Sequence, residues 1–349
     1  MIRNLHLQNF TVFEDAELQF GALNIVHGAN STGKTHLLKL LYALLSSLTP
    51  RANTNAGAAP TKAALEVGFA AELSEVFRPD EGKIGRIASR VQGNTAARIT
   101  SAIDDLGVID LEFSTQSSKA VKIRQLPTRW GERLPVYLPT RELLSVYPGF
   151  QSLYETQAIP FDKTWRDTCT LLGANVARGP KVKAVAALLA PLEEAIGCKA
   201  VLEGGRFYVL MEEPPARVEA DLVAEGLRKL SMVARLIANG SLDGRGCMLW
   251  DEPEANLNPR LIREVAPLLI KLAAAGVQIF VATHSLFLLR EFEIGLAGRT
   301  PALHTRFFGL HRRERAVTVE QGPSVYDSGD IAALDESLSQ SDRFMSSGA

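Results

Sequence analysis

The sequence predicts an α/β fold with a mixed central sheet, an antiparallel β subdomain and a helical insertion. A short apolar strand at residues 23–27 leads through a glycine-bearing loop into a helix whose leucines recur at helical spacing over residues 34–48. Continuous apolar runs at residues 246–250 and 277–283, with a helix between them, are typical of buried parallel strands. Short alternating runs between glycine- and serine-rich turns over residues 84–126 are typical of an antiparallel sheet.

The remaining elements follow from the same two periodicities. Residues 2–8 and 16–20 alternate between polar and apolar side chains, as half-buried antiparallel strands do. An apolar stripe over residues 62–78 predicts a second helix, and residues 135–138 predict a further buried strand. A long helix is predicted over residues 219–238, because its apolar side chains fall on one face.

Length and composition indicate a globular chain of several parts. With 349 residues, 46% of them apolar, the chain can bury a sizeable core and is long enough for about two domains. We expect an N-terminal lobe at residues 1–135, a helical insertion with a hairpin at residues 136–215, and a C-terminal lobe at residues 216–349. The hairpin is expected to span residues 199–211 and to turn at its pair of glycines.

Charge and cysteine usage limit the partners and the compartment. The net charge of −1 gives no global basic field, so charge does not indicate nucleic acid as a partner and leaves that question open. We expect no membrane-spanning segment, because no run of about 18 apolar residues occurs, and no signal peptide. The cysteines are far apart and lack a C-x-x-C pair, which favours a reducing, cytoplasmic setting over disulfides or a zinc site. They are Cys169, Cys198 and Cys247.

The loop after the strand at residues 23–27 fits the phosphate-binding pattern G-x-x-x-x-G-K-[ST]. In this pattern backbone N–H groups and a helix N-terminus hold a triphosphate. Lys34 is expected to reach the β- and γ-phosphates, and the Thr35 hydroxyl is expected to be a ligand of Mg²⁺. The motif consists of Gly28, Ala29, Asn30, Ser31, Thr32, Gly33, Lys34 and Thr35, and His36 completes the predicted nucleotide-binding set.

Two adjacent acids end the apolar strand at residues 247–250. In a phosphate-loop site Asp251 would hold Mg²⁺ through its hydration shell, and Glu252 would orient or deprotonate the water that attacks the γ-phosphate. The alternative is that the Asp-Glu-Pro sequence only opens a turn before the helix that begins at Pro259. The phosphate loop upstream favours the functional interpretation.

His284 follows the next apolar strand, at residues 277–283. From this position an imidazole could contact the γ-phosphate side of the same pocket. The alternative for a single histidine is a structural role. Its place after the strand that follows the two acids favours function.

With these motifs the chain resembles the soluble ATP-binding-cassette (ABC) ATPases of the AAA family. This group includes the recombination-F, structural-maintenance-of-chromosomes and overcoming-lysogenization-defect ATPases, with bacterial anti-phage ATPases among them. The resemblance covers about residues 1–48 and 215–310. The matching segments are the opening strand at residues 2–10, the Walker A loop at 28–35, the Walker B strand at 248–252, the D-loop at 254–259, and His284 as the switch histidine.

The resemblance implies an ABC-type P-loop head whose copies pair around two ATP molecules. Each nucleotide would also contact a Ser-x-Gly signature segment of the opposite head, for which the best match here is Ala224-Glu225-Gly226. Ala224 lacks the hydroxyl that the family serine offers, and this bears on how strongly ATP would drive dimerisation. The Gly226 N–H and the helix end could still contribute.

Two further family features have weaker counterparts. Arg141 and Glu142 stand roughly where a glutamine loop would be, and a surface ion pair is an equal alternative for Arg141. Phe10, Thr11 and Phe13 lie where the family often places adenine contacts. For the two phenylalanines we expect core packing instead.

These observations lead to one functional hypothesis and its alternatives. We expect a Mg²⁺-dependent ATPase that forms a homodimer or higher homo-oligomer, whose nucleotide-controlled association switches a separate effector protein. Anti-phage defence is inferred from the resemblance alone. The alternatives are an ATP-binding scaffold with little turnover, an ATPase of the DNA repair or recombination type, and a P-loop phosphotransferase, which would not need the two acids and the histidine.

Overall fold

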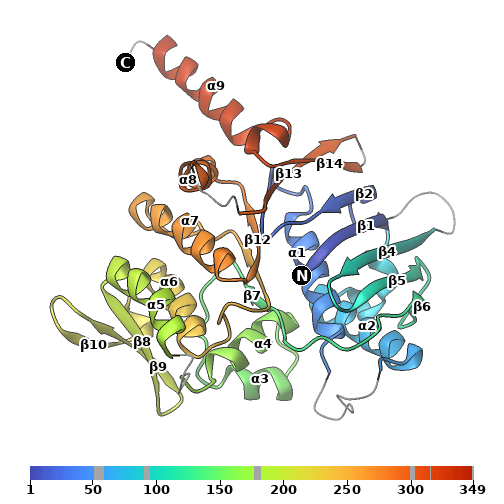
Figure 1. The fold of residues 1–349 in the computed structure, drawn as a ribbon, viewed down its shortest axis with the longest axis horizontal. Coiled ribbons are helices and arrows are strands. Elements are labelled where there is room, and N and C mark those ends of the chain that lie inside the picture. Colours follow the sequence, from blue (N-terminus) through green and yellow to red (C-terminus); the bar gives the residue numbers. More distant parts are fainter. Residues whose placement is uncertain (51–58, 90–94, 177–181, 299–302, 315, 348–349) are drawn as a thin grey trace. The chain divides into compact units, whose positions relative to one another are not determined.

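The computed structural model describes residues 1–50, 59–89, 95–176, 182–298, 303–314 and 316–347. The chain divides into two compact units, shown in Figure 1 with the chain coloured along its length. Unit 1 consists of residues 1–134 and 280–349, and unit 2 consists of residues 135–279. The strand β12 (Gln278–Thr283) carries the chain from unit 2 into unit 1.

Unit 1 contains the predicted antiparallel β subdomain as a sheet of five strands in the order β2-β1-β4-β5-β6. Each pair of neighbours is antiparallel. Burial alternates along β2 and β4, so one face of these strands is packed and the other is polar, as their sequences predict. The strands are β1 (Ile2–Phe10), β2 (Phe13–Gln19), β4 (Ala96–Ile103), β5 (Gly107–Ser114) and β6 (Lys122–Gln125).

A second sheet of unit 1 leads into the phosphate loop and combines both kinds of pairing. The strand β3 (Leu23–Gly28) is parallel to β13 (Thr305–Arg313), with Ile25 opposite Phe307. β13 is antiparallel to β14 (Ala316–Gly322). The apolar side chains of β3 are fully buried, which explains why its sequence lacks alternation. The mixed sheet that the sequence predicts is therefore present.

Several α-helices lie in the described part of unit 1. The helices α1 (Lys34–Ser47) and α2 (Lys62–Phe77) follow the phosphate loop, and α8 (Leu286–Leu296) follows β12. The last helix, α9 (Ala332–Ser346), has no buried residue. Its periodic Ile331, Leu334 and Leu338 are followed by mostly polar residues, so the sequence gives little sign of what this helix packs against.

Unit 2 is built around β11 (Cys247–Asp251), which is parallel to β7 (Val136–Leu138) with Leu249 opposite Tyr137. All residues of both strands are buried. The helices are α3 (Phe150–Thr156), α4 (Lys163–Leu172), α5 (Val182–Ile196), α6 (Glu225–Ala238) and α7 (Pro259–Ala274). The Asn258 side chain caps α7 by accepting a hydrogen bond from the N–H of Leu261 at 3.0 Å.

The predicted hairpin is confirmed in unit 2. β8 (Cys198–Glu203) and β9 (Arg206–Met211) are antiparallel, and the turn between them has two glycines with φ of 56° and 76°. A third strand, β10 (Ala216–Glu219), pairs with β9 and was not foreseen. Its four residues alternate between apolar and charged side chains, but a run this short does not by itself indicate a strand. Over the described part of the chain, none of the helices is both long enough and apolar enough to cross a bilayer.

The packing of unit 1 predicts opposite effects of two glycine substitutions on the free energy of unfolding. A Cβ at Gly309 in β13 would lie 1.8 Å from the carbonyl oxygen of Ser328, whereas a Cβ at Gly68 in α2 would meet nothing within 4 Å. Gly309→Ala should therefore lower the free energy of unfolding by about 3 kcal/mol or more. Gly68→Ala, the matched control, should raise it by about 0.5 to 1 kcal/mol. Chemical denaturation measures both, and equal effects of the two variants would contradict this packing.

Candidate functional site

The phosphate loop joins β3 to α1 through left-handed backbone. Ser31 has a φ of 64° and Gly33, the residue that caps α1, has a φ of 92°. A Cβ at Gly33 would also lie 2.6 Å from Cγ2 of Val12, so glycine is required here by both conformation and space. The turn directs the first backbone N–H groups of α1 toward the loop, where an anion would be stabilised.

Lys34 stabilises the phosphate loop by hydrogen bonds to its main chain. Its ammonium donates hydrogen bonds to the carbonyl oxygens of Gly28 at 2.7 Å and Ala29 at 2.9 Å, and the residue is only 6% exposed. The Thr32 hydroxyl donates to the same Ala29 oxygen at 2.9 Å. Thr35 is exposed at the start of α1. The loop therefore presents an ammonium, a hydroxyl and a helix N-terminus, which together suit a phosphate chain.

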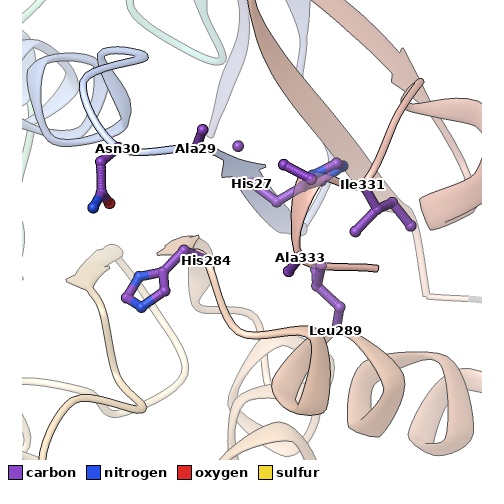
Figure 2. A pocket seen from close by; sticks show the side chains of 9 residues that line it. His27, Ala29, Asn30, His284, Leu289, Ile331 and Ala333 are labelled. Carbon is purple, nitrogen blue, oxygen red and sulfur yellow. The ribbon is translucent and has the colours of Figure 1, made fainter. Parts of the chain in front are cut away.

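A cavity of about 230 Å³ lies beside this loop within unit 1. His284, which directly follows β12, lines it together with the loop residues Ala29 and Asn30. In Figure 2 the Asn30 side chain and the His284 ring lie on one side of the cavity. Leu289, Ile331 and Ala333 lie on the other side. Unit 1 thus brings the predicted switch histidine and the phosphate loop to one cavity, and the predicted role of His284 remains a prediction.

The first turn of α9 was not predicted as part of this cavity. Residues 331–333 line it, although they are about 300 residues from the phosphate loop in the sequence. The sequence carries no motif at this segment, and its polar surroundings suggest an ordinary surface tail. Only the folded arrangement of β3, β13 and the segment after β14 brings it there.

His27 is a second residue that the sequence analysis missed. It ends β3 one residue before Gly28, is 2% exposed, and its Nε2 lies 2.6 Å from the Ser328 hydroxyl. Because that hydroxyl donates to the carbonyl of Val325 at 2.5 Å, the imidazole donates its Nε2–H to Ser328. Burial, together with the smaller effects of the charges of His311 and Lys34, lowers the pKa of His27 to about 4.

The aromatic residues near the loop belong to the core. Phe10 and Phe13 are fully buried, and the Phe10 ring packs edge-on against Phe77 at 5.6 Å between centroids, so the expected core packing is confirmed. The His36 ring also lies beside Phe77, at 6.0 Å between centroids. Burial lowers the pKa of His36. Nucleotide contacts of Thr11 and His36 remain predictions.

In unit 2 the two acids end a fully buried strand. Asp251 is 4% exposed, and the Tyr137 hydroxyl on β7 donates to its Oδ2 at 3.4 Å. Burial, and then the charge of Asp251, raise the pKa of Tyr137, so the phenol stays protonated and remains a donor to the carboxylate. Glu252 has a φ of 48° and Asn256 a φ of 62°. Both lie in the left-handed region, which asparagine adopts fairly often and glutamate seldom.

The signature-like segment packs directly against the D-loop turn. A Cβ at Gly226 would lie 3.0 Å from the carbonyl oxygen of Asn256, so this glycine permits the close approach of α6 to the turn. The Asn256 amide donates to the Glu225 carboxylate at 2.8 Å. Ala224, Gly226, Asn256 and Arg260 line a cavity of about 540 Å³ at this end of α6. The glycine therefore has a packing role, and contact between Gly226 and a nucleotide remains a prediction.

The segment after β7 contains a buried ion pair. The Glu142 carboxylate lies 2.8 Å from Nε of Arg228 and accepts a hydrogen bond from the N–H of Leu144 at 2.7 Å. Arg141 is exposed and lines a cavity of about 380 Å³ together with Glu225 and Arg228. Glu142 thus has a structural role in this ion pair, whereas Arg141 lines a polar cavity.

Comparisons with known proteins agree with this geometry. A family model described as "AAA domain" matches residues 4–142, and one described as "AAA domain, putative AbiEii toxin, Type IV TA system" matches residues 216–290. These segments contain the phosphate loop and the strand with the two acids, respectively. No curated protein shows a significant match to the sequence.

Two solved structures are similar over nearly their whole length. The first is an Smc head bound to the C-winged helix domain of ScpA, with a TM-score of 0.54 and 12% identity, covering 92% of this chain and 97% of that chain. The second is an Smc head with an extended coiled coil bound to the C-terminal domain of ScpA derived from Pyrococcus furiosus, with a TM-score of 0.53 and 12% identity, covering 99% of each chain. At this identity the likeness establishes the fold.

The buried His27 makes stability depend on pH in a defined window. Between about pH 6.5, the ordinary pKa of histidine, and about pH 4, the unfolded chain binds a proton that folded His27 does not. Stability should therefore fall as the pH is lowered through this window, with His27 contributing up to about 1.4 kcal/mol per pH unit. His27→Gln removes this contribution. Urea denaturation of both proteins between pH 4.5 and 7 should show a smaller slope for the variant, and parallel profiles would refute this assignment.

Proposed function

We propose that the chain is an ABC-class AAA ATPase that hydrolyses ATP with Mg²⁺, a proposal supported by its fold and by the two AAA-domain matches. The observation that carries this proposal is the phosphate loop. Its left-handed turn and the hydrogen bonds from the Lys34 ammonium to the loop carbonyls fix the shape of the loop. Such a preformed loop can bind phosphate with little reorganisation of the chain.

The donors of the chain suit a nucleotide with a magnesium ion. Mg²⁺ takes one or two protein oxygens and fills its other positions with water and phosphate oxygens, and Thr35 and Asp251 offer a hydroxyl and a carboxylate. When bound, the ion would neutralise charge on the β- and γ-phosphate oxygens. Lys34 would exchange its loop carbonyls for phosphate oxygens, which are stronger acceptors because they are charged.

Glu252 is the residue that we propose to orient and deprotonate the attacking water. Its left-handed backbone supports this role, because strain of this kind is kept mainly where a side chain must be aimed. His284 would contact the γ-phosphate side of the same nucleotide, a proposal supported by its place on the cavity beside the phosphate loop.

We further propose that ATP controls the association of two heads, as a homodimer or higher homo-oligomer, and that this association switches a separate effector protein in the cytoplasm. The cavity lined by Gly226 and Asn256 is the surface that we propose a second head contacts. The similar Smc heads are themselves bound to a domain of ScpA, which supports a protein partner. The match to a model that names a toxin of a toxin–antitoxin system favours a defence role over DNA repair.

A second candidate is an ATP-binding scaffold with little turnover. Ala224 favours it, because an alanine at the start of α6 has no hydroxyl to offer to a γ-phosphate. The two candidates differ in how turnover depends on concentration. A rate that rises with the square of the protein concentration supports paired heads that hydrolyse ATP, and the absence of turnover supports the scaffold.

Lys34→Ala should weaken Mg-ATP binding by at least about tenfold, because it removes the ammonium from the phosphate loop. Binding can be measured with a fluorescent ATP analogue. Lys39→Ala, one turn further along α1, is the control and should bind the analogue as the wild type does. Equal affinity of the Lys34 variant and the wild type would contradict the assignment of the loop.

Glu252→Gln should reduce ATP turnover by about 10² to 10⁴ while leaving Mg-ATP binding intact, because the amide can position water but cannot accept its proton. Phosphate release measures the turnover, and size-exclusion chromatography with and without ATP measures the association of heads. Stable ATP-dependent dimers of this variant are the expected result. Unchanged turnover would show that another group activates the water.

A further inference from the structure

Lys229 is a fully buried lysine on α6, one helical turn after Gly226. Its ammonium donates three hydrogen bonds, to the carbonyl oxygens of Thr140 at 2.7 Å, Glu252 at 2.8 Å and Ala255 at 3.1 Å. An ammonium has three donors, so its donor capacity is filled by main-chain oxygens. This residue matches no motif and has no place in the reaction described above.

The three acceptors come from segments that are far apart in the sequence. Thr140 belongs to the segment after β7, whereas Glu252 and Ala255 begin and end the turn that follows β11. The Glu252 carbonyl also accepts a hydrogen bond from the N–H of Ala255 at 3.1 Å. Lys229 therefore joins α6 to both ends of the turn that carries Glu252.

The turn needs such a support. Glu252 has a φ of 48°, and a side chain other than glycine adopts this conformation only where its surroundings fix it. Hydrogen bonds to the Glu252 and Ala255 carbonyls fix the peptide planes on either side of the turn. The direction of the Glu252 side chain depends on those planes.

A lysine is a costly choice for packing alone. Burial lowers the pKa of Lys229 to about 8, although Glu254, Glu225 and other nearby acids raise it. An apolar side chain of similar length would fill the same space without this cost. The hydrogen bonds from the ammonium to the three carbonyl oxygens therefore account for a lysine at this position.

We propose that Lys229 is a positioning residue that fixes the backbone of Glu252 for water activation and ties it to α6. This inference rests on the proposed ATPase function for its catalytic consequence. Its structural part, the support of the turn at residues 252–255, can be tested without turnover. The two parts have separate readouts.

The test compares Lys229→Met with a matched control on the same helix. Arg235 is also buried, and its guanidinium donates to the carbonyl oxygens of Leu172 at 3.2 Å and Ala174 at 2.8 Å, away from the turn that carries Glu252. Arg235→Met therefore removes a buried cation that bonds to main chain without touching the Glu252 turn. Thermal unfolding of both variants gives the loss of stability in each.

Lys229→Met should lower kcat by about 10- to 100-fold while KM for ATP stays within about twofold of wild type, because a displaced Glu252 affects the reaction and not the binding of phosphate. Amide hydrogen exchange should accelerate at Ala255 and Leu257, whose N–H groups bond to carbonyls of the turn. Arg235→Met should change neither kcat nor the exchange at these two amides.

Each remaining outcome decides the matter. An unchanged kcat in folded Lys229→Met, or an equal loss of kcat in Arg235→Met, overturns the positioning role. If Lys229→Met does not fold, Lys229→Gln, which keeps two N–H donors, is measured in the same way. Its loss of kcat should be smaller than the 10- to 100-fold expected for Lys229→Met, with KM unchanged. If the wild type does not hydrolyse ATP, the proposed function fails. Faster exchange at Ala255 and Leu257 in Lys229→Met would still show that Lys229 stabilises the turn.

Discussion

The loops after β3 and β11 both contain left-handed turns. In each loop a buried lysine ammonium donates hydrogen bonds to main-chain carbonyl groups of the turn. In the phosphate loop Lys34 bonds to Gly28 and Ala29. In the turn after β11 Lys229 bonds to Glu252 and Ala255. Each hydrogen bond gives a donor to a carbonyl group of the turn, so both lysines stabilise the turns that they contact. The functional side chains depend on these two contacts.

The two lysines differ in what else they can bind. Lys34 lies at the first turn of its own helix, beside the exposed Ala29 and Asn30, and a charged phosphate oxygen can replace its carbonyl partners. Lys229 is fully enclosed and all of its partners are main-chain oxygens. The same chemical group therefore serves as an exchangeable ligand in one loop and as a permanent support in the other. Solvent access makes the difference.

Much of the fold and part of the candidate site could be predicted from sequence because the signals are local. The strand, glycine loop and helix around Lys34, the buried strand before Asp251 and the hairpin with two adjacent glycines are each contained in fewer than about 30 consecutive residues. Periodicity and turn chemistry act over such distances. The antiparallel strands of unit 1 alternate in sequence for the same reason.

The parts that could not be predicted join distant segments. His27 contacts Ser328, which is 301 residues away, and Lys229 contacts Thr140, 89 residues away. Neither contact has a spacing or a motif, because tertiary folding alone creates it. The left-handed backbone of Glu252 was also unforeseeable, since a glutamate gives no sign of positive φ in a sequence. Gly226 was predicted from its resemblance to a signature segment, and its close packing against the Asn256 carbonyl could not be predicted.

The helix α9 is a suitable site for a spectroscopic label, because it begins at the cavity and the rest of it is exposed. Its first turn lines the cavity beside Asn30 and His284, and none of the side chains from Ala332 to Ser346 is buried. A fluorophore or spin label on the exposed Gln340 would therefore leave the core undisturbed while remaining on a helix that starts at that cavity. Changes in the cavity on nucleotide addition could then be followed in real time through the signal of a label on α9.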